Sequence, residues 1–337
     1  MVVPGPTPPG CGRFAPTPTG RLHLGNLRTA WLAELASHSF GHRFVLRIDD
    51  LDPKATIPGM IEAQIDDLAW FGIKFDEGYK VGGESGPYLQ SQRYYHYRRA
   101  LHALNEMGLL YPCWCSRKEV LAAAQAPHES NQSPLYPGTC RPDRPTPIDN
   151  LDKLPERRGR RPALRLNIRE AFMQLGLETL SFDDLVAGKQ PDYTASTLDD
   201  FVVRRVDGIA SYQIACAVDD ALMNCELVVR GADLLISTIR QIMVLKLLKH
   251  SIPKYAHIGL VVGHDGKRLA KRDQSVAIAD LRQRKVDPML IRHFFEAGVF
   301  DNNSPSTETR LHHLKLDDRL MDPVRLPKQS PWSPSET

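Results

Sequence analysis

The chain has 337 residues, with 43 Lys and Arg against 40 Asp and Glu, which gives a formal net charge of +3. This length allows more than one domain and a sizeable core, and the mild positive charge permits RNA binding by a local patch without arguing for it. Six cysteines are too few for a disulfide framework, and no apolar run reaches the ~18 residues that span a bilayer. We therefore expect a soluble, cytoplasmic enzyme with no signal peptide and no membrane partner.

The N-terminal stretch predicts a disordered tail followed by a strand, a turn and a helix. Residues 1–12 hold four prolines and three glycines, so we expect a tail whose cysteine has no role. In residues 13–26, RFAPTPTGRLHLGN, Pro16 and Pro18 end the strand because proline fixes φ and cannot donate to a ladder. From Leu24 onward, apolar residues recur with the helical period.

The N-terminus of this helix carries a histidine and a glycine. Unpaired N–H groups and the positive end of the helix dipole make such a place an anion site. His23 can donate to phosphate oxygens, and Gly25, which has no side chain, allows a flat base to lie against the backbone. The alternative is an ordinary strand-to-helix turn with an incidental histidine.

Acidic residues end the next predicted strand. The strand spans 44–48 and is followed by a run of acids that includes Asp49 and Asp52. Carboxylates at a strand end lie at the carboxyl edge of a parallel sheet, where open α/β folds bind their ligands. The alternative, which we prefer for Asp52, is that they cap a turn. Helices are then predicted over 58–71 and 88–107, each followed by a glycine.

Three cysteines surround a polar, proline-rich loop. Cys113 and Cys115 precede this loop, which spans 127–162, and Cys140 lies within it. A segment with so few apolar residues needs a cross-link to stay ordered, and a bound zinc ion can supply one. The Cys-x-Cys spacing is shorter than the usual zinc spacing, so three ordinary thiols are the alternative. By ligand chemistry alone, His128 would complete the site.

Further local signals lie around this loop. Ser116 with Glu119 forms a capping box that opens a helix through residue 124. The run RRGRR at 157–161 either is solvated or follows RNA phosphates. Strands are predicted over 163–168 and 182–186.

The second half of the chain predicts alternating strands and helices. Asp207-Gly208 between two apolar runs predicts a hairpin of strands 201–206 and 209–218. The remaining predictions are a strand over 226–229, a helix over 236–250, a strand over 257–262, a helix over 288–298 and a flexible polar tail over 301–337.

A cationic loop and a strand-end arginine are candidate ligand contacts. Residues 263–272 place four cations in six positions, which suits a polyphosphate whose charge grows as pyrophosphate leaves; a solvated basic loop is the alternative. Arg230 ends a strand, where its planar fork suits a carboxylate, and the hydroxyl of Tyr212 can fix orientation. The alternatives are a surface ion pair for Arg230 and a core aromatic ring for Tyr212.

Together these strings resemble the glutamyl branch of the class I aminoacyl-tRNA synthetases. Residues 23–26, HLGN, resemble the HIGH signature, and residues 13–20 match the Arg-Phe-Ala-Pro-x-Pro-x-Gly of the branch. Residues 268–272, RLAKR, resemble its KMSKS loop imperfectly, with Ala270 in place of the serine. Asp49 stands where the branch has a glutamate that contacts the amino group of the amino acid, and it is one methylene shorter. The other matching positions are the Gln-Ser-x-Arg of 90–93, Tyr212, Asp219-Asp220 and Arg230-Gly231.

The resemblance runs from Arg13 to about Gly298 and implies an α/β fold with a class I synthetase Rossmann-type parallel sheet. It adds an inserted zinc-bearing α+β domain of the acceptor-binding type and a small C-terminal helical part. The implied organisation is a tail at 1–12, the first half of the catalytic domain at 13–110, the zinc insertion at 111–192, the second half at 193–262, the KMSKS-type loop and helical part at 263–300, and a tail at 301–337.

The resemblance also implies roles for single residues. The implied glutamate contacts are Arg13, Phe14, Ala15, Pro16, Thr17, Asp49, Tyr212 and Arg230. The implied ATP contacts are His23, Gly25, Asn26 and Lys271, of which His23 and Lys271 are the catalytic residues. A tyrosine serves as a zinc ligand in the insertion of glutamyl-type synthetases. The implied ligands are therefore Cys113, Cys115, Tyr136 and Cys140, with His128 in reserve.

The chain leaves no room for the helical anticodon-binding domain of a full glutamyl-tRNA synthetase, and in this it resembles the glutamyl-Q tRNA(Asp) synthetases. That resemblance implies activation of L-glutamate by ATP and Mg²⁺ without tRNA, transfer of the glutamate to the queuosine base of tRNA(Asp), one structural Zn²⁺, and no DNA partner. Two alternatives remain: a truncated glutamyl-tRNA synthetase that charges a tRNA 3′ end, and a non-catalytic zinc-containing RNA-binding protein. Only Asp49 and Ala270 support the latter.

Overall fold

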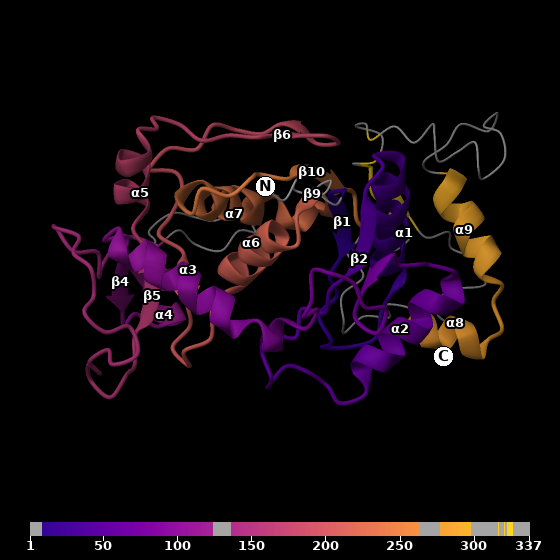
Figure 1. The fold of residues 1–337 in the computed structure, drawn as a ribbon, viewed down its shortest axis with the longest axis horizontal. Helices are drawn as coiled ribbons and strands as arrows, with labels where there is room; N and C mark the ends of the chain where they lie inside the picture. Colours follow the sequence, from indigo (N-terminus) through magenta and orange to yellow (C-terminus); the bar gives the residue numbers. More distant parts are fainter. Residues whose placement is uncertain are drawn as a thin grey trace, which may run out of the picture.

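The computed structural model describes residues 9–123, 136–262 and 277–297, and near the C-terminus residues 316, 320 and 322–325. Its main sheet has seven strands in the order β3-β2-β1-β9-β10-β6-β7, parallel except for the last pair (Figure 1). The strands are β1 (Cys11–Phe14), β2 (Arg43–Leu46), β3 (Glu77–Gly78), β6 (Asp183–Asp184), β7 (Gly188–Lys189), β9 (Cys225–Gly231) and β10 (Lys254–Ile258). The predicted α/β class with a parallel sheet is confirmed.

Two apolar cores cover the two faces of this sheet. Successive side chains of a strand point to opposite faces, so β9 places Leu227 and Val229 in one core and Val228 in the other. The first core contains helices α1 (Leu24–Ser39) and α2 (Met60–Phe71). The second contains α3 (Tyr94–Glu106), α5 (Ile168–Leu175), α6 (Tyr212–Leu222) and α7 (Leu235–Leu247).

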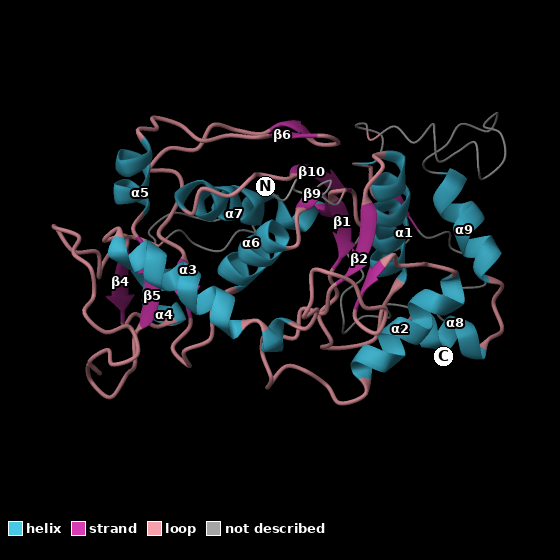
Figure 2. Ribbon diagram, in the orientation of Figure 1, coloured by secondary structure: helices cyan, strands magenta, loops and turns pink. Residues whose placement is uncertain are grey.

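A long excursion separates β3 from β9. It contains a short 3₁₀ turn (Gln90–Gln92), α4 (Arg117–Ala123) and an antiparallel sheet of β4 (Leu110–Cys113), β5 (Ala163–Leu166) and β8 (Val202–Arg204). Figure 2 shows this sheet at the far end of the molecule from α1. The hairpin of β6 and β7 leaves the excursion and returns to the main sheet, where β6 pairs with β10. The hairpin thus extends the main sheet at its β10 edge.

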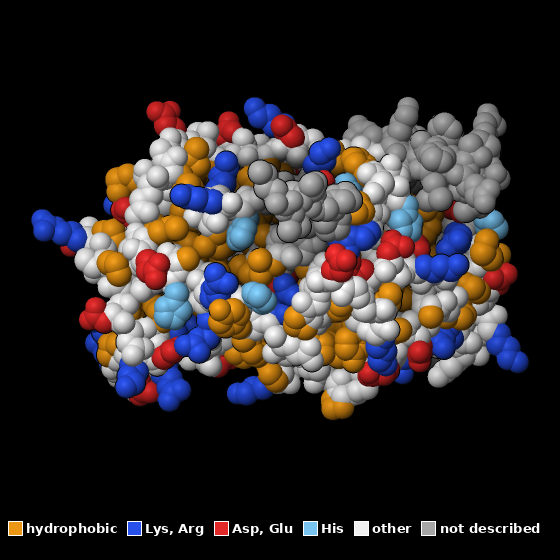
Figure 3. Space-filling model, viewed as in Figure 1, with side chains coloured by type: hydrophobic (Ala, Val, Ile, Leu, Met, Phe, Trp, Pro, Cys, Tyr) orange, Lys and Arg blue, Asp and Glu red, His pale blue; other side chains and the backbone are white. Residues whose placement is uncertain are grey.

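The C-terminal part packs on the first core. Helices α8 (Ile278–Gln283) and α9 (Pro288–Ala297) contribute Ile278, Ile291 and Phe295 to that core, and β11 (Val261–Val262) pairs with β12 (Val324–Arg325). Figure 3 shows charged side chains of both signs interspersed over the visible face, as the small net charge suggests. Within the described ranges, no helix combines the length and apolar character needed to cross a bilayer.

The structure corrects several predicted elements. Strand β1 begins at Cys11, which is fully buried with its Sγ 3.0 Å from that of Cys225, so residues 11–12 belong to the sheet and not to a tail. A Cβ at Gly12 would overlap Oγ of Ser37 on α1, so a larger residue there would force the Ser37 side chain to move. Residues 320–325 include a buried leucine and a strand, so the predicted C-terminal tail is wrong for that segment.

The predicted hairpin is half wrong. Its turn forms, since the Arg205 N–H donates to the Ile209 carbonyl, but the returning strand ends at Ala210 and gives way to α6. Helix α6 is buried on almost every side from Ile214 to Asp220, and a short apolar run of that kind looks alike as strand or helix. Helix α5 was also missed: Asn167 caps it where a strand was predicted to continue.

Candidate active site

The candidate site is a cleft of about 510 Å³ at the carboxyl ends of β1 and β9. The strand order reverses between these two strands, and such a switch point is where open α/β sheets bind their ligands. The cleft brings together every predicted glutamate and ATP contact that the structure describes: Arg13, Phe14, Ala15, Pro16, Thr17, His23, Gly25, Asn26, Asp49, Tyr212 and Arg230. Lys271 lies outside the described residues.

His23 is the N-cap of α1, and its contacts change the anion-binding role that we expected for the N-terminus of this helix. Its Nδ1 accepts from the backbone N–H of Gly25 at 3.1 Å and of Asn26 at 3.4 Å, while Oδ1 of Asn26 accepts from the His23 N–H. These N–H groups are therefore not free for an anion, contrary to our expectation. Because Nδ1 accepts, the neutral ring carries its proton on Nε2. A donor for phosphate is thus retained on the side chain.

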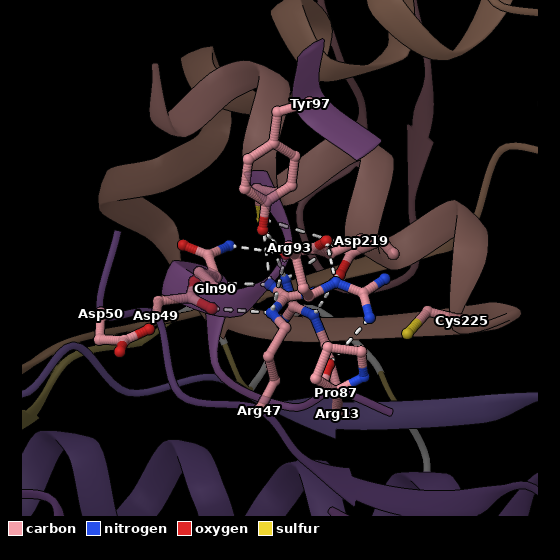
Figure 4. A network of polar contacts seen from close by, with 12 residues as sticks. Arg13, Arg47, Asp49, Asp50, Pro87, Gln90, Arg93, Tyr97, Asp219 and Cys225 are labelled. Atoms are coloured by element: carbon pink, nitrogen blue, oxygen red, sulfur yellow. Dashed lines mark hydrogen bonds and ion pairs between the residues drawn. The ribbon is translucent and has the colours of Figure 1, made fainter. Parts of the chain in front are cut away.

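Arg13 and Asp49, which line the cleft, belong to a network of buried charges (Figure 4). Asp220 accepts from Nε and Nη2 of Arg13 at 3.1 and 3.2 Å and from Nη1 of Arg47 at 2.6 Å. Arg47 also donates from Nε to Asp49 at 2.7 Å. All four side chains are at most 6% exposed, so their attraction is weakly screened. Placing four charges in the interior requires this mutual pairing.

The two carboxylates of this group have opposite pKa shifts. Burial raises the pKa of Asp49 to about 6, although Arg47 opposes the shift. Burial also acts to raise the pKa of Asp220, but Arg13 and Arg47 outweigh it and lower that pKa to about 2. Asp220 is therefore a permanent anion that holds the two guanidinium groups, whereas Asp49 can gain a proton in mildly acidic solution.

A neighbouring cluster fixes the position of α6. Asp219 accepts from Nε of Arg93 at 2.6 Å, from the amide of Gln90 at 2.9 Å and from the hydroxyl of Tyr97 at 2.7 Å (Figure 4). Burial and the neighbouring Asp219 raise the pKa of Tyr97, which therefore remains a donor. These contacts tie the start of α3 to the end of α6, which also carries Asp220, the partner of Arg13 and Arg47.

Arg230 and Tyr212 are neither a surface ion pair nor a core ring. Arg230 is 4% exposed at the end of β9, and Tyr212, the first residue of α6, is 36% exposed at the cleft. Nε of Arg230 donates to Nε2 of His257 at 3.1 Å and Nη2 donates to Oγ1 of Thr238 at 2.7 Å. Nη1 is buried and has no partner among the described residues. A carboxylate in the cleft would satisfy this donor.

Both ends of the segment that carries Lys271 lie at the cleft. Val261, just before that segment, lines the cavity. Ala277, just after it, forms a bridge with His23, and the Ile278 N–H donates to the Leu22 carbonyl. The described residues that flank the segment therefore lie at the cleft, on the side where α1 begins.

The sulfur atoms of three cysteines lie close enough together to bind one metal ion. The sulfurs of Cys113, Cys115 and Cys140 lie within 4.8 Å of one another, and those of Cys115 and Cys140 are 3.6 Å apart. A tetrahedral zinc with Zn–S of ~2.3 Å spaces its sulfurs by roughly 3.8 Å. The Tyr136 hydroxyl lies 3.4 Å from Sγ of Cys113 and accepts from the Cys140 N–H at 2.8 Å. Three sulfurs and a phenol oxygen thus suit one zinc ion; His128 lies outside the described residues.

The basic run does not form a cluster of free cations. Arg157 lies over the Trp114 ring at 3.8 Å, and Arg160 pairs with Glu119, which also closes the predicted capping box with Ser116. Arg161 pairs with Glu156. Because these contacts are exposed, they favour the alternative in which the arginines of the run are solvated over the one in which they follow RNA phosphates.

Sequence reasoning missed several residues of the site. Arg47 lies two residues before Asp49, so strand alternation places both on one face, and this signal was present. Thr238, His257 and Asp184 lie on separate elements, and no local pattern joins them to Arg230.

Comparisons with known proteins show which family this chain belongs to. The family model for the catalytic domain of class I tRNA synthetases (E and Q) matches residues 11–304. The Glutamyl-Q tRNA(Asp) synthetase of Symbiobacterium thermophilum is 43% identical over 97% of this chain and 97% of its own length. Glutamate–tRNA ligase 2 of Alkalilimnicola ehrlichii is 41% identical over 80% of this chain but 54% of its own. The crystal structure of the glutamate–tRNA synthetase from Elizabethkingia anophelis superposes with a TM-score of 0.73 at 25% identity, over 94% of this chain and 68% of that one.

Proposed function

This chain belongs to the class I tRNA synthetases for glutamate and glutamine, and on that premise we propose that it activates L-glutamate with ATP in the absence of tRNA and transfers the glutamate to the queuosine base of tRNA(Asp). The observation that carries this proposal is the cleft at the sheet's switch point. It offers an anionic Asp49 and an unsatisfied Arg230 donor on one side and the start of α1 on the other.

The glutamate is held by complementary charges. Asp49 takes the ammonium group, a carboxylate meets Nη1 and the second N–H of Nη2 of Arg230, and the Tyr212 hydroxyl fixes orientation. Arg13, whose guanidinium is held by Asp220, presents positive charge to the same cavity. Phe14, Ala15, Pro16 and Thr17 form the wall.

The nucleotide lies against the start of α1. Nε2–H of His23 donates to a phosphate oxygen, and the adenine lies beside Gly25, where any Cβ would meet the His23 ring at 3.0 Å. To Lys271, which lies outside the described residues, we assign the neutralisation of charge on the leaving pyrophosphate. Mg²⁺, bound with ATP, neutralises further phosphate charge when it is present.

The chemistry requires placement more than proton transfer. A glutamate carboxylate oxygen attacks the α-phosphorus, the bond to pyrophosphate breaks, and the electron pair leaves with pyrophosphate, so no general base is needed. The residues above supply alignment and charge stabilisation.

The names of the relatives that match nearly the whole of this chain favour queuosine over a 3′ end as the acceptor. The Glutamyl-Q tRNA(Asp) synthetase of Symbiobacterium thermophilum is 43% identical over 97% of this chain, and that of Nocardia farcinica is 40% identical over 98% of it. The inserted part, closed by one structural zinc on Cys113, Cys115, Tyr136 and Cys140, is the part that we assign to tRNA contact.

Two assays test the proposal in sequence. We expect glutamate-dependent exchange of pyrophosphate into ATP with no tRNA present; exchange that needs tRNA would favour a glutamyl-tRNA synthetase. We then expect transfer of labelled glutamate to tRNA(Asp) that carries queuosine and none to the same tRNA without it. No exchange together with no ATP binding would support a non-catalytic RNA-binding protein.

A further inference from the structure

We propose that Asp184 and His257 are positioning residues for Arg230: they fix the guanidinium of this cleft-lining residue, and the inserted hairpin thereby completes the glutamate site. This inference rests on the proposed function for its kinetic consequence, but its structural content can be tested separately.

The contacts form a continuous series across four elements. Oδ2 of Asp184, on β6, lies 2.6 Å from Nδ1 of His257, on β10. Nε2 of the same ring lies 3.1 Å from Nε of Arg230 and 2.9 Å from Oγ1 of Thr238 on α7. Both Asp184 and His257 have fully buried side chains, so water does not compete for these bonds.

Only one arrangement of protons fits the hydrogen bonds that link Asp184, His257 and Arg230. Backbone N–H groups of Val186, Ala187 and His257 donate to Asp184 at 2.8–3.2 Å, which favours its anionic form. Burial acts to raise the pKa of Asp184, but its hydrogen bonds with His257 and these backbone groups lower it overall. Burial lowers the pKa of His257, so the ring is neutral. An anionic Asp184 can only accept, so Nδ1 carries the proton and Nε2 must accept from Arg230.

This arrangement leaves little freedom to Arg230. Its Nε is committed to His257 and one N–H of Nη2 to Thr238, which leaves Nη1 and the second N–H of Nη2 as the edge for a ligand. The His257 ring stacks on Tyr255 at 6.1 Å between centroids, and Phe182 lies 6.3 Å away, so the imidazole is held as well. Asp184 thus acts on the glutamate site through the tautomer of one histidine.

The test is a double-mutant cycle with Asp184→Asn and His257→Gln. In Asp184→Asn the amide would donate toward Nδ1, so His257 would shift its proton to Nε2, where it would face the donor Nε–H of Arg230. We expect the KM for glutamate to rise about ten- to a hundred-fold with little change in the KM for ATP. Asp183→Asn, an exposed neighbour on β6, is the matched control and should leave both constants unchanged.

The cycle separates positioning from mere structural support. Glutamine at 257 has no tautomer and can present its oxygen to Arg230, so Asp184→Asn should add little to the KM for glutamate in that background. Equal effects of Asp184→Asn in both backgrounds would overturn the proposal.

A spectroscopic measurement keeps the inference independent of activity. In wild-type protein labelled with ¹⁵N-histidine, we expect the Nδ1–H tautomer at His257 and its inversion in Asp184→Asn. An Nε2–H tautomer in the wild type would refute the proposed arrangement. If the wild type shows no pyrophosphate exchange but the tautomer behaves as expected, the proposed function fails while the positioning of Arg230 stands.

Discussion

Nε of Arg47 lies 2.7 Å from Oδ1 of Asp49, so the residue that we assign to the ammonium group of glutamate is already paired within the protein. The pair is buried, and Arg47 also contacts Asp220. Asp49 thus has a fixed orientation before any ligand arrives. This pairing is one reason that an aspartate can serve where the glutamyl branch has a longer glutamate.

The pKa of Asp49 predicts an acid limb in glutamate binding. The carboxyl must be ionised to hold an ammonium group, and burial raises its pKa to about 6. Below pH 6 we expect the KM for glutamate in pyrophosphate exchange to rise by about tenfold per pH unit, with the KM for ATP little changed. In Asp49→Asn the KM should be high and independent of pH between 5 and 7. A wild-type KM that stays constant down to pH 5 would contradict the assignment.

Asp220 should instead control stability in acid. Its pKa is lowered from 3.8 to about 2, so the stabilisation is fully present above pH 4 and is lost as the pH falls toward 2; the shift corresponds to about 2 kcal/mol. Asp49 acts in the opposite direction and mainly above pH 3.8, where its folded form is already protonated while its unfolded form is still ionised, so its contribution changes little below pH 3.

Removing the Asp220 charge should also destabilise the protein at neutral pH. Asp220→Asn leaves Arg13 and Arg47 partly unpaired in the interior, and we expect a loss of roughly 3–5 kcal/mol in the free energy of unfolding, measured by urea titration. The control is Asp152→Asn, which removes an exposed pair with Arg98 and should cost less than about 1 kcal/mol. Equal losses in the two variants would show that the buried group is not tightly coupled.

The zinc proposal predicts different outcomes for its candidate ligands. Elemental analysis should find about one zinc per wild-type chain, almost none in Cys140→Ser, and a more easily chelated ion in Tyr136→Phe. His128→Ala should retain its zinc. A folded wild type without metal would eliminate the site, and loss of zinc in His128→Ala alone would move the fourth ligand to His128.

Lys271 should act on the rate and not on glutamate binding. We expect Lys271→Ala to lower the kcat of pyrophosphate exchange by about 10²–10³-fold, because it removes a charge that stabilises the leaving pyrophosphate, while glutamate affinity measured by calorimetry stays the same. Lys74→Ala, an exposed lysine after α2, is the control. A kcat within a few-fold of the wild type would exclude Lys271 from the nucleotide site.

The sequence by itself determined the family strings, the strand–turn–helix from Arg13 to Asn26, and most of the cleft lining. These features are local, because prolines, helical period and short motifs act over a few residues. The predictions were wrong where the local pattern did not distinguish the alternatives. Residues 212–218 were predicted as a strand but form a helix that is buried on almost all sides. Cys11 was predicted to lie in a tail, because glycines and prolines surround it, but it belongs to a strand.

Only the tertiary structure decided how the charges are paired. Asp220 lies 173 residues from Arg47 in sequence, and Asp184 lies 73 residues from His257, yet each pair is in contact. No periodicity encodes such distances, because they follow from strand order and from the return of the β6 hairpin to β10. The same long-range packing sets the pKa of Asp49, because its burial, the main cause of the shift, exists only once β1, β2 and α6 are assembled.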